Sequence, residues 1–533
     1  MPLELRIEQV ARELEAVRAE LIRTQEDMEE LNRIGAALSG ERDLGSLLEM
    51  ILEKARWITS ADAGSLYLVD ETVEGTRSLR FRVTQNNSST FPFQEFTMPL
   101  SETSMAGYVA IHGEVIEVED AYKLTKAASN RPYQFNPAYD QSTGYRTRSM
   151  LTLPMKNAKA KVIGVLQLIN CKRDRGMQLK LTEVHAFPPR AVRLAHSLAS
   201  QAAVAYENSQ LYQNVGALFE GFVKASVTAI EQRDPTTSGH SLRVAKMIEG
   251  LAEVVGRVNI GPYAQMRFTP DQMKELRYAA LLHDFGKVAV REEVLIKAKK
   301  LYPFHLTILQ HRFDYVRKTL ENDYANKKLA VVLARGLEGQ EEFSRLDEDL
   351  HQEQIQLDEY LRFILEVNEP TVLRAGQFGR LIEIARKTYL NPAGDEQALL
   401  TPEEVRSLSI SQGSLDEDER RQIESHVMHS FNFLMQIPWT SQMRGIPLIA
   451  RGHHEKLNGT GYPDHLRSDQ IPVQAKMMTI CDIFDALSAS DRPYKKAVPV
   501  DRALDILKMS VRDQELDADL FQMFVEAHIF LVI

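Results

Sequence analysis

Cysteine is scarce in this chain of 533 residues, which contains only Cys171 and Cys481. The two lie too far apart in sequence to suggest a disulfide framework, and each adjoins an apolar run, so we expect two buried free thiols. The sequence also lacks a run of about eighteen apolar residues, which excludes a membrane-spanning helix. It does not open with the basic and apolar regions of a secretory signal. Together these absences predict a cytoplasmic protein.

A surplus of positive charge is missing as well. The 74 acidic residues outnumber the 64 basic ones and give a formal net charge of −10, whereas a general nucleic-acid binder usually carries a basic surplus. We therefore expect no nucleic-acid polymer as a partner, while a local basic pocket for a phosphate ligand stays open. The apolar fraction of 44% is ordinary for a soluble protein, and the length allows two or three domains.

Residues 1–31 are predicted to form an amphipathic helix. Its apolar positions recur at alternating spacings of four and three, as in the heptad seam of a coiled coil. The seam consists of Leu3, Ile7, Val10, Leu14, Val17, Leu21, Thr24, Met28 and Leu31. A helix lying on its own domain would show a similar pattern. Because little else in the segment is apolar, we favour a parallel coiled-coil homodimer.

Residues 32–185 change to a pattern of helices and strands, which predicts an α/β domain. The expected strands are 65–69, 79–83, 115–118, 150–155 and 162–170. We expect a mixed sheet with helices on one face. A long helix is predicted over 186–232, and its part at 186–218 is expected as a linker, either as an element that transmits a conformational change or as a rigid spacer.

Several stretches of this domain resemble the GAF family of ligand-sensing modules, namely 106–110, 120–122, 143–149, 153–155 and 162–170. The domain is most similar to the GAF domains of cyclic-nucleotide phosphodiesterases, which implies a small ligand such as a cyclic nucleotide. In those domains Lys directly follows Asn, whereas here Cys171 separates Asn170 from Lys172. Asp120, Phe135 and Asp140 are the candidate pocket residues, although turn or core roles would explain them equally well.

The strongest chemical signal is the adjacent pair His283-Asp284, which follows an apolar run and is therefore expected to be buried. A buried imidazole and carboxylate need a metal ion or hydrogen-bond partners. Other residues extend the series to seven candidate metal ligands, which are His240, His283, Asp284, His426, His453, His454 and Asp482. His305, His311 and His429 are alternatives to His426.

Five imidazoles and two carboxylates suit a pair of first-row transition metals, for which we predict iron or manganese bridged by Asp284. A single zinc ion would need only three or four of these ligands. Two neighbouring ions activate a hydroxide and neutralise the phosphate oxygens of a diester. The series therefore predicts a phosphodiesterase, and the competing interpretation is a set of unrelated core histidines.

With Gly286-Lys287, Glu455 and the turn Gly459-Thr460-Gly461-Tyr462-Pro463, this series resembles the HD-GYP family of the HD phosphohydrolase superfamily. The resemblance covers about residues 220–298 and 414–525. It implies an all-helical domain that hydrolyses cyclic di-GMP to linear pGpG, and sometimes on to GMP. Two alternatives stay open: a catalytically weak scaffold that binds cyclic dinucleotides, and a hydrolase of another one such as cyclic GMP-AMP.

The expected protein is thus multidomain: an N-terminal coiled-coil helix (1–31), an α/β GAF sensor (32–185), a linker helix (186–218) and an all-α HD-GYP domain (219–533). A long charged insertion at 299–413 is expected to form a helical arm or lid. The insertion departs from the short connection that is typical of the family.

The resemblance also implies roles for single residues. Lys287 would contact the phosphate beside the catalytic Asp284, and Tyr462 would approach the ligand. Arg492 and Lys495 would bind phosphate or guanine.

Asp485 is expected to orient the local helix rather than to bind metal. Asn458 stands where an Asp is common in the family. We expect this difference to have a small effect, because both residues suit a turn. Some members hold a third metal, but the turn at 236–239 offers no acidic ligand for one. Only Glu231 and Asp234 lie near enough in sequence to serve.

Overall fold

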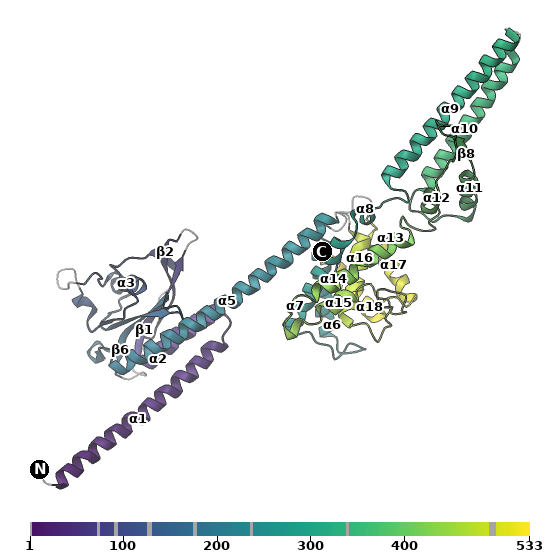
Figure 1. The fold of residues 1–533 in the computed structure, drawn as a ribbon. Helices are drawn as coiled ribbons and strands as arrows, with labels where there is room; N and C mark the ends of the chain where they lie inside the picture. Colours follow the sequence, from purple (N-terminus) through teal and green to yellow (C-terminus); the bar gives the residue numbers. More distant parts are fainter. Residues whose placement is uncertain are drawn as a thin grey trace. The chain divides into compact units, whose positions relative to one another are not determined.

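In the computed structural model the chain divides into two compact units, Met1–Phe219 and Glu220–Ile533 (Figure 1). The structure describes residues 3–71, 75–89, 94–124, 131–173, 179–234, 238–336, 340–489 and 497–532, with the backbone alone for 3–11, 340 and 375. Within these ranges no helix has both the length and the apolar character that crossing a bilayer requires.

Unit 1 begins with α1 (Leu3–Gly40), which ends nine residues beyond the predicted helix. Along the expected seam, Leu14, Val17, Leu21 and Met28 are 60–69% exposed. The last part of α1 packs on its own unit through Ile34 and Leu38, and Asp27 Oδ2 accepts a hydrogen bond from Arg190 Nε at 2.7 Å. At Leu14, Val17 and Leu21 the helix therefore leaves its apolar side chains exposed rather than packed on its own unit.

The sheet of unit 1 has the strand order β3-β2-β1-β6-β5-β4, with β7 paired to β6. The strands are β1 (Ala61–Glu71), β2 (Arg77–Asn86), β3 (Phe96–Pro99), β4 (Ile116–Val118), β5 (Met150–Lys156), β6 (Val162–Lys172) and β7 (Val184–His185). Every pairing between these strands is antiparallel. The expected mixed sheet was wrong, and the short strands β3 and β7 were missed.

Helices cover both faces of this sheet, not one as expected. Leu66 and Leu68 of β1 face the cluster formed with α2 (Leu44–Thr59) and α5 (Pro189–Arg233). Tyr67 between them faces the opposite cluster, which includes α3 (Met105–His112). Successive side chains of a strand point to opposite faces, so a strand buried throughout needs cover on both sides.

Two further elements complete unit 1. The short helix α4 (Ala138–Thr143) precedes β5. The long helix predicted over 186–232 corresponds to α5, which runs unbroken from Pro189 to Arg233.

Unit 2 is mostly helical. Its helices outside the insertion are α6 (His240–Arg257), α7 (Pro270–Leu282), α8 (Glu292–Leu295), α13 (Glu417–Glu424), α14 (His426–Leu434), α15 (Ile446–Arg451), α16 (Val473–Ser488), α17 (Val500–Arg512) and α18 (Ala518–Glu526). The first three of these helices precede the insertion and the other six follow it. The two halves pack together, for example where α6 contacts α16.

The insertion contains α9 (Pro303–Arg335), α10 (Gln340–Val367), α11 (Ala375–Ala385) and α12 (Pro402–Leu408), with the small hairpin of β8 (Thr388–Leu390) and β9 (Glu396–Ala398). The long helices α9 and α10 lie side by side (Figure 1). Near their base they share an apolar core with α11 and α12, in which Leu309 and Phe313 meet Phe363 and Ile364. The insertion is therefore a subdomain with a core of its own.

Candidate metal centre

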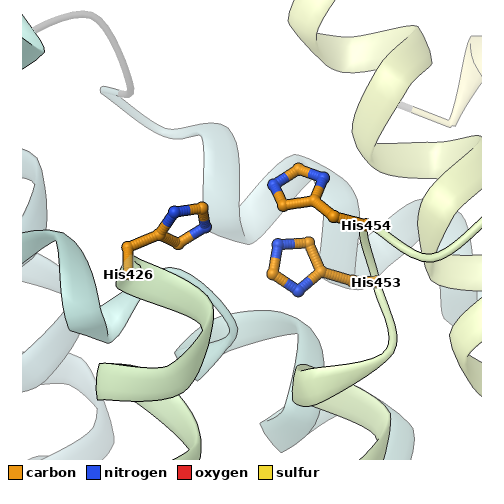
Figure 2. Close-up of side chains that lie close together, drawn as sticks. All are labelled: His426, His453 and His454. Carbon is orange, nitrogen blue, oxygen red and sulfur yellow. The ribbon is translucent and has the colours of Figure 1, made fainter. Parts of the chain in front are cut away.

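The structure brings all seven predicted ligands together inside unit 2. Three overlapping groups have donor atoms within 4.8 Å of one another: His426 with His453 and His454, His240 with His283 and Asp284, and His283 with His453 and Asp482. Figure 2 shows the first group, with the ring of His426 facing the adjacent pair His453 and His454. His305, His311 and His429 are exposed and belong to none of the groups found among the described residues.

Three of the histidines are oriented by the same kind of local hydrogen bond. In each, Nδ1 donates a hydrogen bond to the carbonyl oxygen three residues earlier, namely His283 to Ala280 at 2.7 Å, His426 to Ile423 at 2.5 Å and His453 to Ala450 at 2.5 Å. These carbonyls lie in the last turns of α7, α13 and α15, where acceptors have no partner within the helix. The bond fixes the tautomer and leaves the lone pair on Nε2.

The Nε2 atoms of His283, His426 and His453 are buried and have no hydrogen-bond partner among the described residues. Leaving a buried polar atom unsatisfied costs about 1–3 kcal/mol. Two of them face the same carboxylate: Asp284 Oδ1 lies 3.2 Å from Nε2 of His426, and Asp284 Oδ2 lies 3.4 Å from Nε2 of His283. Imidazole lone pairs and carboxylate oxygens that face a common space are the donor set of a transition-metal site.

His240 is oriented by a carboxylate instead. Its Nδ1 donates to Oδ2 of Asp485 at 2.7 Å, while its Nε2 lies 3.1 Å from Oδ1 of Asp482. Arg243 holds Asp485 from the other side, with Nε donating to Oδ1 at 2.6 Å. Asp485 therefore acts directly on a candidate ligand, which is more specific than the helix-orienting role expected for it. The contribution of Arg243 was missed by the sequence reasoning.

Lys287 supplies a positive charge beside the centre. Its Nζ lies 2.9 Å from Asp284 Oδ2 and 3.1 Å from Asp234 Oδ2. Burial by itself would raise the pKa of Asp284, but the positive charge of Lys287 outweighs burial and holds that pKa well below its usual value. Asp234, expected as a spare metal ligand, is instead paired with Lys287.

The pKa shifts of His283, His454 and Asp482 favour the protonation states that metal ligands need. Burial lowers the pKa of His283, and it lowers the pKa of His454 to about 3. Burial acts to raise the pKa of Asp482, but its hydrogen bond with His240 outweighs burial and lowers it. Neutral imidazoles and ionised carboxylates are the forms that bind metal.

The motif glycines allow close backbone packing at the centre. A Cβ at Gly286 would overlap the carbonyl oxygen of His426, and a Cβ at Gly461 would overlap the backbone nitrogen of Lys456. Gly286 N also donates to Ser430 Oγ at 2.8 Å. The turn after His283-Asp284 can therefore lie directly on α14, which carries His426.

The loop after His454 is held by Glu455. Its buried carboxylate accepts hydrogen bonds from the backbone of Asp464 at 2.6 Å and of Leu466 at 2.9 Å. This arrangement places Tyr462 against the centre, with its ring centroid 4.8 Å from that of His454. Two other predicted substrate residues, Arg492 and Lys495, lie outside the described residues.

The three residues of unit 1 that were predicted to bind a small ligand, Asp120, Phe135 and Asp140, surround Tyr122. Asp140 is 5% exposed and accepts hydrogen bonds from Tyr122 and Thr147. Asp120 Oδ1 accepts a hydrogen bond from the backbone nitrogen of Tyr122. The ring centroid of Phe135 lies 5.1 Å from that of Tyr122. These contacts give each of them a structural role. Asp120 also lines a cavity of about 270 Å³.

Comparison with known protein families agrees with the division of the chain into two units. The GAF domain family matches residues 43–206, and two HD domain families match residues 237–364 and 394–520. The two HD matches leave residues 365–393 of the insertion between them. Each contains part of the ligand set, His240, His283 and Asp284 in the first and His426, His453, His454 and Asp482 in the second.

Three curated relatives are phosphodiesterases. The chain is 42% identical over 96 residues to 3'3'-cGAMP-specific phosphodiesterase 3 of Vibrio cholerae, covering 18% of this chain and 20% of that protein. It is 37% identical over 131 residues to the cyclic di-GMP phosphodiesterase response regulator RpfG of Xanthomonas campestris pv. campestris, covering 24% and 31%. It is 29% identical over 163 residues to cyclic di-GMP phosphodiesterase PA4108 of Pseudomonas aeruginosa, covering 31% and 34%.

The chain thus spans between 20% and 34% of the length of each of these relatives. The GAF match, the two HD matches and the converging ligand set agree with the motifs in the sequence. The chain contains a GAF domain followed by an HD domain of the HD-GYP type.

Proposed function

We propose that this protein is a metal-dependent phosphodiesterase that hydrolyses cyclic di-GMP to pGpG, and in part on to GMP. The observation that carries the proposal is the convergence of seven ligand side chains, three of which have buried Nε2 atoms without a hydrogen-bond partner among the described residues. The names of two relatives support cyclic di-GMP as the substrate.

The donor set fits two transition-metal ions, for which we propose iron or manganese. His283 and His453 each belong to two of the three groups, and such shared membership suits neighbouring ions better than a single one. Asp284 lies near His240, His283 and His426, which supports it as the bridging ligand. When bound, the ions would supply an activated water and neutralise charge on the phosphate.

The chain's own residues would bind and orient the substrate. Lys287 keeps a positive charge beside Asp284, where it would contact a phosphate oxygen. Tyr462, stacked near His454, would border the substrate. From the family resemblance, Arg492 and Lys495 would hold phosphate or guanine.

The rest of the chain would regulate this activity. We propose that the GAF domain binds a small ligand such as a cyclic nucleotide and that α1 forms a coiled-coil homodimer. The exposed apolar side chains of Leu14, Val17, Leu21 and Met28 support the dimer. The buried free thiols of Cys171 and Cys481 support a reducing compartment such as the cytoplasm.

The direct test pairs the metal content of anaerobically purified protein with a hydrolysis assay on cyclic di-GMP. Wild type is expected to hold about two ions per chain and to form pGpG. The His283→Ala variant should lose both properties, whereas His305→Ala, which changes an exposed histidine of the insertion, should lose neither. Metal-loaded wild type that leaves cyclic di-GMP intact would contradict the proposal.

A second candidate substrate is 3'3'-cGAMP, because the Vibrio cholerae relative named for that substrate is 42% identical over the aligned 96 residues. A panel of cyclic dinucleotides compared by kcat/KM would separate the two substrates. Tight binding of a cyclic dinucleotide without turnover would instead favour a signalling scaffold.

A further inference from the structure

The entry and exit of the insertion meet at a buried ion pair in unit 2. Lys297 lies ahead of α9 on the entry side, and Glu419 lies in the first turn of α13 on the exit side. Lys297 Nζ is 2.8 Å from both carboxylate oxygens of Glu419, and the two side chains are 2% and 9% exposed. The hydroxyl of Tyr302 donates to the same carboxylate at 2.6 Å. We call Lys297, Tyr302 and Glu419 the neck cluster.

Glu419 also closes the first turn of its own helix. Its Oε2 accepts a hydrogen bond from the backbone nitrogen of Asp416 at 2.9 Å, and Asp416 Oδ1 accepts one from Glu419 N at 2.9 Å. This reciprocal pair is a capping box. The carbonyl of Lys297 accepts a further bond from Ser414 Oγ at 2.8 Å. One carboxylate therefore fixes the start of α13 and binds the entry segment of the insertion to it.

The other end of α13 holds a candidate metal ligand. The carbonyl of Ile423 in its last turn accepts the hydrogen bond from Nδ1 of His426 at 2.5 Å. Nε2 of the same ring lies 3.2 Å from Asp284 Oδ1. With only 8 residues, α13 is about two turns long, so a displacement of its first turn is carried to its last carbonyl.

We propose that Glu419 is a positioning residue for His426. The neck cluster fixes the position of α13, and α13 fixes the orientation of the His426 ring. The contact between the insertion and α13 therefore sets the affinity of the site formed by His426, His453 and His454 for its metal ion. A buried ion pair with further hydrogen bonds selects one arrangement of the elements it joins. This inference rests on the proposed metal centre.

The chain offers a matched control for Glu419. Glu404 occupies the same place in a capping box at the start of α12 and is 5% exposed. It is paired with Arg312 at 2.7 Å and 3.2 Å, within the insertion. Glu419→Gln and Glu404→Gln are therefore the same chemical change at two buried ion pairs, and only the first contacts the helix that orients His426.

The experiment titrates metal-depleted full-length protein with Mn²⁺ by calorimetry and records the thermal midpoint of the metal-free protein. Wild type is expected to show two binding steps. Glu419→Gln should weaken one step by about tenfold or more, the size typical of residues behind a metal ligand. Tyr302→Phe, which removes a single hydrogen bond, should weaken the same step by less. Glu404→Gln should leave both steps as in wild type, whatever its thermal midpoint.

Two results would overturn the inference while leaving the metal centre in place. One is that both variants, Glu419→Gln and Tyr302→Phe, bind Mn²⁺ with the same isotherm as wild type. The other is equal weakening by Glu419→Gln and Glu404→Gln, which would point to general loosening of the insertion. Failure of wild-type protein to bind Mn²⁺ would instead refute the proposed metal centre itself.

Discussion

Oδ2 of Asp485 accepts a hydrogen bond from Nδ1 of His240 at 2.7 Å, although the two residues are 245 positions apart in sequence. The imidazole is thereby held between a carboxylate behind it and Asp482 of the candidate metal centre in front. Asp485 is fully buried and also accepts from Arg243. Removing its charge would therefore change the orientation and basicity of one metal ligand.

The Asp485→Asn variant is expected to weaken Mn²⁺ binding by about 10–100-fold, because an amide orients the imidazole less strongly than a carboxylate does. Calorimetric titration of metal-depleted protein measures the change. Asp517→Asn is the control, since Asp517 accepts a hydrogen bond from Tyr263 at 2.7 Å and belongs to none of the metal groups. Equal affinities for Asp485→Asn and wild type would show that Asp485 does not support His240.

Metal binding is expected to release a proton from His240. Burial would lower the pKa of this imidazole, but its hydrogen bonds with Asp482 and Asp485 raise it to about 9. At pH 7 the metal-free ring is therefore protonated, and an ion that takes Nε2 must displace that proton. The affinity for this ion should rise about tenfold per pH unit below the pKa and level off above it.

Titrations at pH 7 in two buffers with different ionisation enthalpies would count the protons released. We expect about one proton per pair of ions, because burial lowers the pKa of His283, His453 and His454 and favours their neutral form. The His240→Asn variant should show no release. A binding enthalpy for wild type that is the same in both buffers would contradict the expectation.

Gly286→Ala is expected to destabilise unit 2, because the added Cβ would overlap the carbonyl oxygen of His426 and the backbone nitrogen of Ser430. Overpacking of this kind costs about 1–3 kcal/mol. Urea denaturation followed by circular dichroism measures the change in the free energy of unfolding. Gly376→Ala is the control: it lies in α11 with open space at its Cβ and should be neutral or slightly stabilising. Similar effects of the two substitutions would refute the close contact.

The double substitution Leu14→Asp and Leu21→Asp is expected to convert a dimer into a monomer. Both side chains are more than 60% exposed on α1, and charges in a coiled-coil seam cannot be buried without partners. Light scattering after size-exclusion chromatography reports the mass. Leu333→Asp changes an equally exposed leucine of α9 and should leave the mass unchanged. A monomeric wild type would argue against the coiled coil.

In unit 1 the prediction from sequence was good for single strands and poor for their assembly. The five predicted strands correspond to β1, β2, β4, β5 and β6, because apolar β-branched runs between turns are a local signal. Whether neighbouring strands run parallel or antiparallel is decided by how the chain returns between them, and that is not a local property. The sheet was therefore expected to be mixed and is antiparallel in all its strand pairings.

In the candidate metal centre the sequence by itself determined which groups are available. Imidazole and carboxylate lone pairs belong to the residue types, and the apolar runs beside His283 and Asp482 indicate burial, so the seven candidate ligands could be chosen from the sequence, and the structure brings them together. Only the tertiary structure decided how those groups are aimed. The contacts of Asp485 with His240 and of Lys297 with Glu419 join residues 245 and 122 positions apart. Such contacts follow from the packing of whole helices, which leaves no mark in the sequence around either partner.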